Sequence, residues 1–359
     1  MRLPSEPMDN LPTIPPPSSP SPPDPLALAH TSWLQPFVSY FDERGTDLQD
    51  HYSASKISPE VVRSGDGWIT KKQLYRLLDR LARRENVPEL GFTVGERLDH
   101  TSMGVIGQEI DKSNTLGDAL RTFCRLIPRH VEGNEAWVEP GENGQAWLLH
   151  STSTDIGSPI ADHAGLMSLI NIVRLAAGPE WYPAQLQLQT PATNGYRRIP
   201  GLAGSVIEFD MEATGFSFPA ILMLKPISGR PQPVTAADHH EGLLAPGESA
   251  GEKLSRLLGA ILGTGGLVPT LEMMSELTDV STRTLHRRLN TEGLSYQELL
   301  DRARFDRAKE LLCDTDMSVK QLAFELGYSG ANNFIRAFRR LSGQTPGAFR
   351  RESRPQLAS

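Results

Sequence analysis

The sequence has little cysteine and no long apolar run. Only Cys124 and Cys313 occur among 359 residues, and neither belongs to a pair with the spacing of metal ligands. This argues against a disulfide framework or a cysteine-based zinc site and favours a reducing, cytoplasmic setting. Because no stretch of about 18 apolar residues occurs, we expect no membrane span. The N-terminus also lacks the charged start and apolar stretch of a secretory signal.

Basic residues are in the minority. The chain has 36 Lys and Arg against 43 Asp and Glu, a net charge of −7, which by itself argues against a nucleic-acid partner. The distribution is uneven, however. From Gly251 onward there are 16 basic and 13 acidic residues. The residues before Gly251 include 20 basic and 30 acidic ones. An acidic body with a mildly basic C-terminal region is the asymmetry expected when one domain contacts nucleic acid.

Proline and glycine mark the expected domain boundaries in a chain too long for one ordinary domain. Residues 1–27 are rich in Pro and Ser and are expected to be disordered. A second stretch rich in Pro, Gly and charge, 229–252, is expected to be a linker. These breaks leave a large domain at 28–228 and a second domain at 253–352, followed by a flexible tail at 353–359.

The large domain mixes two periodicities. Three segments show the helical spacing of apolar residues: 70–87, 115–130 and 163–178. Three others have strand patterns, the first with a Gly-containing turn in its middle: 135–151, 184–189 and 205–211. We therefore expect an α+β N-terminal domain followed by an all-α C-terminal domain.

Three groups of side chains in or beside this domain could carry chemistry. Trp137 and Trp147 could line an effector pocket, although aromatic residues on strands are more often core residues. The stretch 238–241 has metal-binding residue types but no second ligand cluster, so we expect neither a metal nor a cofactor. No carboxylate pair has catalytic geometry that can be identified, and neither cysteine has an activating context, so the chain is not expected to be an enzyme.

The C-terminal domain contains a weak internal repeat. Each copy has a small residue on one helix, a turn residue that tolerates positive φ, an apolar residue that fixes the turn, and two apolar residues four apart on a second helix. These residues are Ser275, Asp279, Val280, Leu285 and Leu289 in the first copy, and Ala323, Gly327, Tyr328, Phe334 and Phe338 in the second. This is the pattern of a helix-turn-helix.

The second helix of each copy leaves a polar face outward. In the major groove, arginine pairs bidentately with guanine and asparagine with adenine, and a recognition helix reads bases mainly with its N-terminal part. The residues expected at base edges are Arg283, His286, Arg287, Asn332, Asn333 and Arg336. Those expected at phosphates are Thr282, Arg288, Arg339 and Arg340. Arginine-rich faces are often only solvated surface, but two such faces in one domain favour double-stranded DNA as the partner.

Residues 295–312 are expected to form one long helix between the two copies. Ser295 with Glu298 is a capping-box signature, and Ser318 with Gln321 repeats it at the next helix. A helix of this length spans about 27 Å. It could therefore hold two recognition helices in successive major grooves, roughly 34 Å apart.

These features resemble the DNA-binding module of the AraC/XylS family of bacterial transcription regulators, and the resemblance covers 253–352. The most specific motif runs Ala323-x3-Gly327-Tyr328, Phe334-x-Arg336-Ala337-Phe338-Arg339-Arg340 and Gly343-x-Thr345-Pro346-x2-Phe349-Arg350. Ser275 and Asp279 stand where alanine and glycine are usual, and Phe349 replaces the usual tyrosine. Ala331 occupies a position that often carries a polar base reader, so we expect it to contact a thymine methyl group.

The large domain is similar to the ligand-binding and dimerisation domain of one AraC-type subgroup. The matching residues are Glu89-Leu90-Gly91-Phe92-x2-Gly95, Met103-Gly104-x2-Gly107 and Thr115-Leu116-Gly117-x-Ala119-Leu120. The resemblance implies a homodimeric, cytoplasmic transcription activator that senses a small molecule and contacts RNA polymerase. Two alternatives stay open: an enzyme targeted to DNA by the helical domain, and a regulator without an effector that is controlled by its abundance or by a partner protein.

Overall fold

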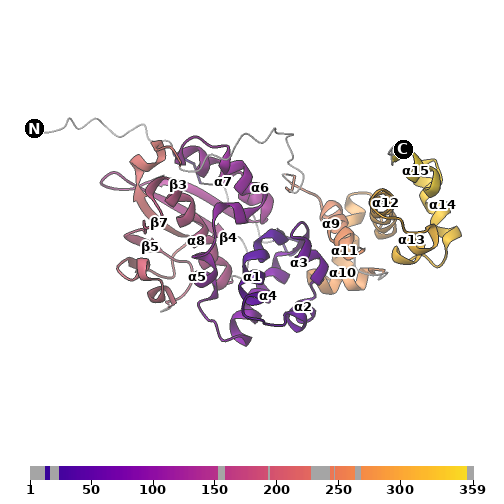
Figure 1. Ribbon diagram of the computed structural model, residues 1–359, viewed down its shortest axis with the longest axis horizontal. Coiled ribbons are helices and arrows are strands. Elements are labelled where there is room, and N and C mark those ends of the chain that lie inside the picture. The colour runs from indigo at the N-terminus through magenta and orange to yellow at the C-terminus, as the bar shows by residue number, and fades with distance from the viewer. Residues whose placement is uncertain are drawn as a thin grey trace, which may run out of the picture.

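The computed structural model combines an α+β N-terminal part with an all-helical C-terminal part, as the sequence predicts (Figure 1). It describes residues 13–16, 24–152, 158–192, 195–227, 243–245, 247–262 and 268–353. The first C-terminal helix begins at Ala250, inside the range expected to be a linker. The stretch 238–241 lies outside the described residues.

A five-stranded sheet forms one layer of the N-terminal part, in the order β3-β4-β7-β5-β6. Its strands are β3 (Asn134–Pro140), β4 (Gln145–Thr152), β5 (Gln185–Gln187), β6 (Val206–Glu208) and β7 (Thr214–Pro219). All pairs are antiparallel except β5 with β6. Val138, Leu148 and Phe216 follow one another across the register and are buried, which defines the inner face of the sheet.

The N-terminal part also contains helices. They are α1 (Gln35–Asp42), α2 (Gln49–Ser55), α3 (Pro59–Ser64), α4 (Lys71–Arg84), α5 (Leu90–Gly95), α6 (Val105–Asp111), α7 (Leu116–His130) and α8 (Pro159–Ala177). Short 3₁₀ turns are η1 (Thr31–Leu34) before α1, η2 (His100–Met103) between α5 and α6, η3 (Gly195–Arg198) and η4 (Pro200–Leu202) between β5 and β6, and η5 (Ala220–Leu224) after β7. Helices α7 and α8 contact strands of the sheet. Local sequence explains where the longer helices begin, because Thr70 and Thr115 each close a capping box.

Helix α8 is the central helix of this domain. It is long and apolar enough to cross a membrane by length and composition, but most of it is buried inside the fold, as expected of a core helix. Two glycines of the motif in α5 allow the close contact between α5 and α8. A Cβ atom at Gly91 would lie 2.2 Å from the Ile160 carbonyl oxygen, and one at Gly95 would lie 2.5 Å from Met167 Cβ.

A two-stranded sheet, β1 (Leu28–His30) with β2 (Trp68–Thr70), lies between the two parts of the chain. Leu26 and Leu28 are fully buried and, with Trp68, belong to the core of the C-terminal domain rather than to the core of their own. The expectation of disorder over 1–27 is therefore wrong for its last residues. The reason is that these apolar side chains have a neighbouring domain to pack against, which the local composition does not reveal.

The C-terminal part consists of seven helices among the described residues. They are α9 (Ala250–Leu262), α10 (Leu271–Thr278), α11 (Thr282–Thr291), α12 (Tyr296–Asp314), α13 (Val319–Glu325), α14 (Ala331–Ser342) and α15 (Pro346–Ser353). They enclose two small cores, one around α9 to α11 and one around α13 and α14. Helix α12 contributes Leu300 to the first core and Leu312 to the second, so it joins the two as a single rigid element.

Candidate nucleic-acid interface

The first helix-turn-helix is formed by α10 and α11. Asp279 has a φ of 58° at the turn, in the left-handed region that Asp tolerates better than most residues. Ser281 then caps α11 by accepting a hydrogen bond from the Thr284 amide at 3.2 Å. Leu285 and Leu289 are both fully buried, so the opposite face of α11 points away from the core.

The second helix-turn-helix is formed by α13 and α14. Gly327 has a φ of 69°, and a Cβ atom there would lie 2.2 Å from Val268 Cγ2, so both conformation and space require glycine. Arg304 of α12 donates from Nη2 to the Gly327 carbonyl at 3.2 Å and fixes the turn. Phe334 and Phe338 are each 1% exposed. Truncating either to alanine would cost about 3–5 kcal/mol.

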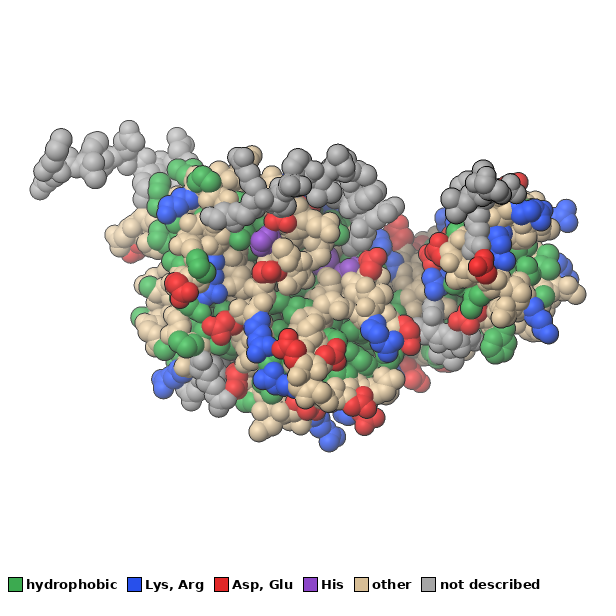
Figure 2. Space-filling view, viewed as in Figure 1, with side chains coloured by type: hydrophobic (Ala, Val, Ile, Leu, Met, Phe, Trp, Pro, Cys, Tyr) green, Lys and Arg blue, Asp and Glu red, His purple; other side chains and the backbone are tan. Residues whose placement is uncertain are grey.

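The residues predicted to read bases lie on the faces opposite these cores. The exposed ones are Arg283, His286 and Arg287 on α11 and Asn332, Asn333 and Arg336 on α14. Ala331 is half-buried and packs against the second core. Figure 2 shows Lys and Arg side chains gathered on the C-terminal lobe, with acidic side chains among them. The geometry thus leaves one polar face free on each predicted recognition helix.

Two of these side chains on α14 hold each other in place. Asn333 donates from Nδ2 to Ser329 Oγ at 2.7 Å, and Arg336 donates from Nη2 to Asn333 Oδ1 at 2.5 Å. Such contacts restrict the rotamers of exposed side chains before a ligand arrives, so less conformational entropy is lost on binding.

The residues predicted to contact phosphates have different surroundings. Thr282 is half-buried at the start of α11, and Arg339 is exposed. Arg340 is also exposed, and its guanidinium donates to Asp301 of α12 at 2.6 Å. Arg288 differs most from expectation, because it donates to Asp24 at 2.9 Å and is half-buried at the contact between the two domains.

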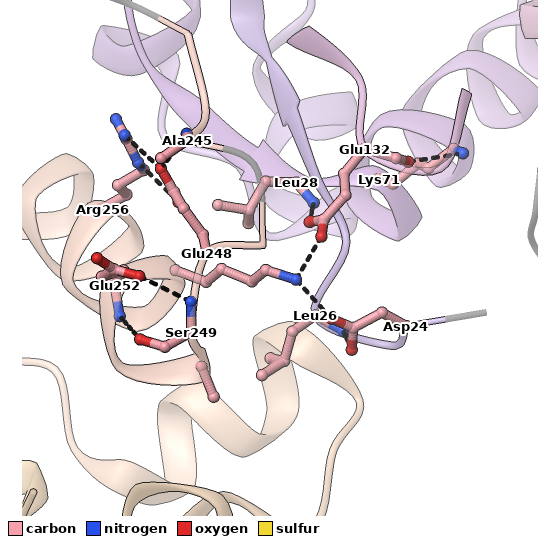
Figure 3. Close-up of polar contacts among 12 residues, drawn as sticks. Asp24, Leu26, Leu28, Lys71, Glu132, Ala245, Glu248, Ser249, Glu252 and Arg256 are labelled. Atoms are coloured by element: carbon pink, nitrogen blue, oxygen red, sulfur yellow. Dashed lines mark hydrogen bonds and ion pairs between the residues drawn. The ribbon is translucent and has the colours of Figure 1, made fainter. Parts of the chain in front are cut away.

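That contact is organised around a buried lysine that the sequence analysis did not single out. Lys253 of α9 lies 2.6 Å from Asp24 Oδ2 and 2.5 Å from Glu132 Oε1. In Figure 3 the carboxylates of Asp24 and Glu132 are both joined by dashed lines to one nitrogen between them. Burial opposes the charge on Lys253, but hydrogen bonds to the two carboxylates outweigh it and raise the pKa of the ammonium. Burial also opposes ionisation of Asp24, yet hydrogen bonds from Lys253 and Arg288 lower its pKa.

Further bonds tie the same residues to the N-terminal domain. Glu132 Oε2 accepts from the Leu28 amide at 3.2 Å, and the Glu132 carbonyl accepts from Lys71 Nζ at 3.0 Å (Figure 3). On the other side, Arg256 of α9 lies 5.4 Å from the ring of Trp68, a cation–π contact. The only local signal of this network is the position of Lys253 on the apolar face of its helix.

The structure places the two tryptophans away from the cavity beneath the inner face of the sheet. Trp137 and Trp147 pack with Leu149 and Ala213 in a small cluster on the outer face of the sheet. Neither lines the cavity beneath the inner face.

Cys124 is buried as well. Burial raises the pKa of its thiol to about 12, so almost no thiolate forms at neutral pH, which argues against a nucleophilic cysteine at this position.

Comparisons with known proteins agree with this architecture. Residues 45–227 match the family described as the arabinose-binding domain of AraC transcription regulators, and residues 274–352 match a helix-turn-helix domain family. The Ornithine utilization regulator of Pseudomonas aeruginosa is 26% identical over 328 residues, which cover 90% of this chain and 96% of that protein. The regulator VirS of Mycobacterium tuberculosis is 24% identical over 336 residues, with the same coverage.

A crystal structure of the regulator CdpR from Pseudomonas aeruginosa aligns with 84% of this chain and 96% of its own, at 21% identity and a TM-score of 0.34. The family match at the N-terminus spans half of the chain, and a helix-turn-helix match follows it. The chain belongs to the AraC family of transcription regulators, DNA-binding proteins with an N-terminal ligand-binding domain.

Proposed function

We propose that this regulator binds a specific DNA sequence by placing α11 and α14 in successive major grooves. The supporting observation is that each helix buries two apolar residues four apart and exposes arginine or asparagine on the other side. Helix α12 has 19 residues and therefore spans about 28 Å, close to the roughly 34 Å between successive major grooves on one side of a duplex.

The exposed residues divide into two roles in this proposal. Those assigned to base edges are Arg283, His286, Arg287, Asn332, Asn333 and Arg336, with Ala331 against a thymine methyl group. Those assigned to phosphates are Thr282, Arg339 and Arg340. We assign Arg288 to the contact between the domains instead, because a guanidinium paired with Asp24 would have to break that ion pair to reach a phosphate.

The N-terminal domain supplies regulation in this proposal. We assign it small-molecule binding and homodimerisation, in a cytoplasmic activator that contacts RNA polymerase. We also keep the division into domains at 28–228 and 253–352 as a proposal, with its edges moved to Asp24, which pairs with Lys253, and to Ala250, where α9 begins.

Selection of bound fragments from random DNA tests the central claim. The full-length protein should enrich sites with two conserved blocks one helical turn apart, and each block should be protected in footprints. An enriched site with a single block would overturn the two-groove arrangement. Arg121→Ala serves as a control, because this exposed arginine on α7 belongs to the other domain and should leave the selected sequence unchanged.

A further inference from the structure

The N-terminal domain encloses a cavity that the DNA-binding role does not use. It has a volume of about 50 Å³ and lies between the inner face of the sheet and helices α4, α7 and α8. This is room for roughly three to five water-sized groups. Most of its wall is apolar, with Phe37, Leu74, Phe123 and Leu169 among the lining residues.

One end of the cavity is polar. Strand register places Asn134 opposite Thr152 and Ala136 opposite His150, so these residues share the inner face of the sheet. Asp162, in the first turn of α8, lines the same cavity. Its Oδ2 accepts a hydrogen bond from Thr214 Oγ1 at 2.8 Å, which fixes the orientation of the carboxyl group.

Several polar atoms at this cavity have no hydrogen-bond partner in the described part of the protein. Among lining residues they are Trp33 Nε1, Asn134 Oδ1, His150 Nε2 and Asp162 Oδ1. His150 and Asp162 are 8% and 6% exposed, and their facing atoms are 3.7 Å apart, too far for a hydrogen bond. Asn134 Oδ1 and Asp162 Oδ1 are acceptors, as is His150 Nε2 in the neutral ring with its proton on Nδ1, whereas Trp33 Nε1 is a donor. Because a buried polar atom without a partner is unfavourable, the end of the cavity at Asn134, His150 and Asp162 favours a ligand that donates hydrogen bonds.

The charge of the wall selects among such ligands. Asp162 and Glu135 are the acidic residues that line the cavity, and among the described lining residues none is Lys or Arg. A carboxylate ligand would therefore meet like charges without a cation to pair with, whereas an ammonium group would meet a carboxylate and two further acceptors. The apolar wall provides the surface for a short alkyl chain.

We propose that this cavity binds a small primary amine, with its ammonium group between Asp162, His150 and Asn134 and its alkyl chain along the apolar wall. The volume suits a molecule of roughly five heavy atoms, the size of n-butylamine. The binding claim stands on the cavity alone. Only its use as an effector site rests on the proposed function.

The position of the cavity gives such a ligand a direct connection to the C-terminal domain. Val131 and Asn134 line the cavity, and Glu132 between them holds Lys253 of α9. A ligand that moves Asn134 by a fraction of an ångström would therefore act on the ion pair that joins the two domains.

Thermal unfolding of the full-length protein without DNA tests the proposal. We expect n-butylammonium chloride to raise Tm in a saturable way, as a ligand that binds only the folded state must. Sodium butyrate, n-butanol and sodium chloride at the same concentration should not. Equal shifts with amine and carboxylate, or no shift with the amine, would overturn the proposal.

Two variants locate the binding site. Asp162→Asn keeps an acceptor for Thr214 but removes the charge, and the apparent affinity for the amine should fall at least tenfold. Gly165→Ala places a Cβ atom 3.3 Å from His150 Cε1 and narrows the cavity, while alanine favours the helix. It should bind the amine more weakly, and its Tm without amine, compared with that of the parent protein, measures any cost to folding. An amine-induced shift unchanged in both variants would contradict the assignment of the site.

Gly259→Ala is the matched control, because this helical glycine of α9 has open space around its Cβ position. It should respond to the amine as the parent protein does. DNA binding measured on the same preparations separates the two proposals. If the amine fails to bind while the selected DNA site is still recognised, the cavity assignment is wrong and the DNA-binding function is unaffected.

Discussion

The ammonium group of Lys253 lies 2.5 Å from Oε1 of Glu132, an ion pair between the first helix of the C-terminal domain and the turn that follows α7 in the N-terminal domain. Asp24 and Arg288 complete the cluster, so two positive and two negative groups meet at one contact. Because the charges balance, the cluster can be half-buried without leaving an isolated ion. The two domains are therefore held by complementary charge as well as by the apolar residues around Leu28.

Replacing Lys253 with methionine should loosen the contact between the domains. The substitution keeps the alkyl packing but leaves Asp24 and Glu132 without their shared cation. Breaking a buried pair costs about 3–5 kcal/mol, and we expect about 2 kcal/mol because both carboxylates are partly exposed. Urea unfolding measures the loss of stability, and hydrogen exchange should show faster opening of β1 and α9.

Lys309→Met provides the control for this change. Lys309 forms an exposed pair with Asp306 three residues earlier on α12, and such pairs contribute at most about 1 kcal/mol. If Lys253→Met is no more destabilising than Lys309→Met, the cluster does not hold the domains together.

Replacing Arg336 with alanine should relax the DNA sequence preference. Arg336 is exposed on α14, and Asn333 orients it toward the side that faces away from the core. If it reads one base, its loss should cost about 1–3 kcal/mol on the selected site and little on a site altered at that base. Competition binding against single-base variants of the site measures this, and a uniform loss across all variants would assign Arg336 to the backbone instead.

Replacing Arg340 with alanine should weaken binding to all sequences alike. Arg340 is exposed near the end of α14, where a guanidinium can reach a phosphate after leaving Asp301. The slope of log K against log salt should become shallower by about 1. A slope equal to that of the parent protein would show that Arg340 stays paired with Asp301 in the complex.

Local signals predicted the elements that carry this function. Ser295 and Ser318 cap the helices they were expected to cap, because a capping box is formed by residues three apart. Asp279 and Gly327 adopt positive φ at the two turns, as expected, because aspartate and glycine tolerate this conformation better than most residues. The α+β N-terminal fold and the helical C-terminal domain followed from such patterns.

The domain contact and the cavity were not predictable in the same way. Asp24 and Lys253 are 229 positions apart, and neither segment contains a motif that indicates its partner. Trp137 shows a different limit of prediction from sequence. Strand alternation predicts that neighbours point to opposite faces, but not which face meets the core, and here Ala136 and Val138 face inward.

Replacing Gly327 with alanine should destabilise the second helix-turn-helix. The left-handed conformation costs about 1–2 kcal/mol for an L-residue, and the added Cβ atom would overlap Val268. DNA affinity and Tm should both fall. Gly330→Ala, three residues later in the same turn, is the matched control, because its φ of 174° suits any residue and nothing lies near its Cβ position. Equal effects of the two changes would exclude this explanation.

Acid should destabilise the N-terminal domain because two of its histidines are buried in neutral form. Burial and the neighbouring His30 lower the pKa of His130 to about 3, and burial together with His150 lowers that of His163 to about 4. In the unfolded chain each histidine has a pKa near 6.5. The unfolded state therefore binds more protons as pH falls below 6.5, and the stability that is present above pH 6.5 is lost.

Between pH 7.5 and 5 the loss of stability should be about 2 kcal/mol for each of these two histidines. Urea unfolding of the parent protein, His130→Gln and His163→Gln at both pH values measures it, and each variant should lose about 2 kcal/mol of the parent protein's acid sensitivity. A variant that keeps the full sensitivity would assign the effect to other groups.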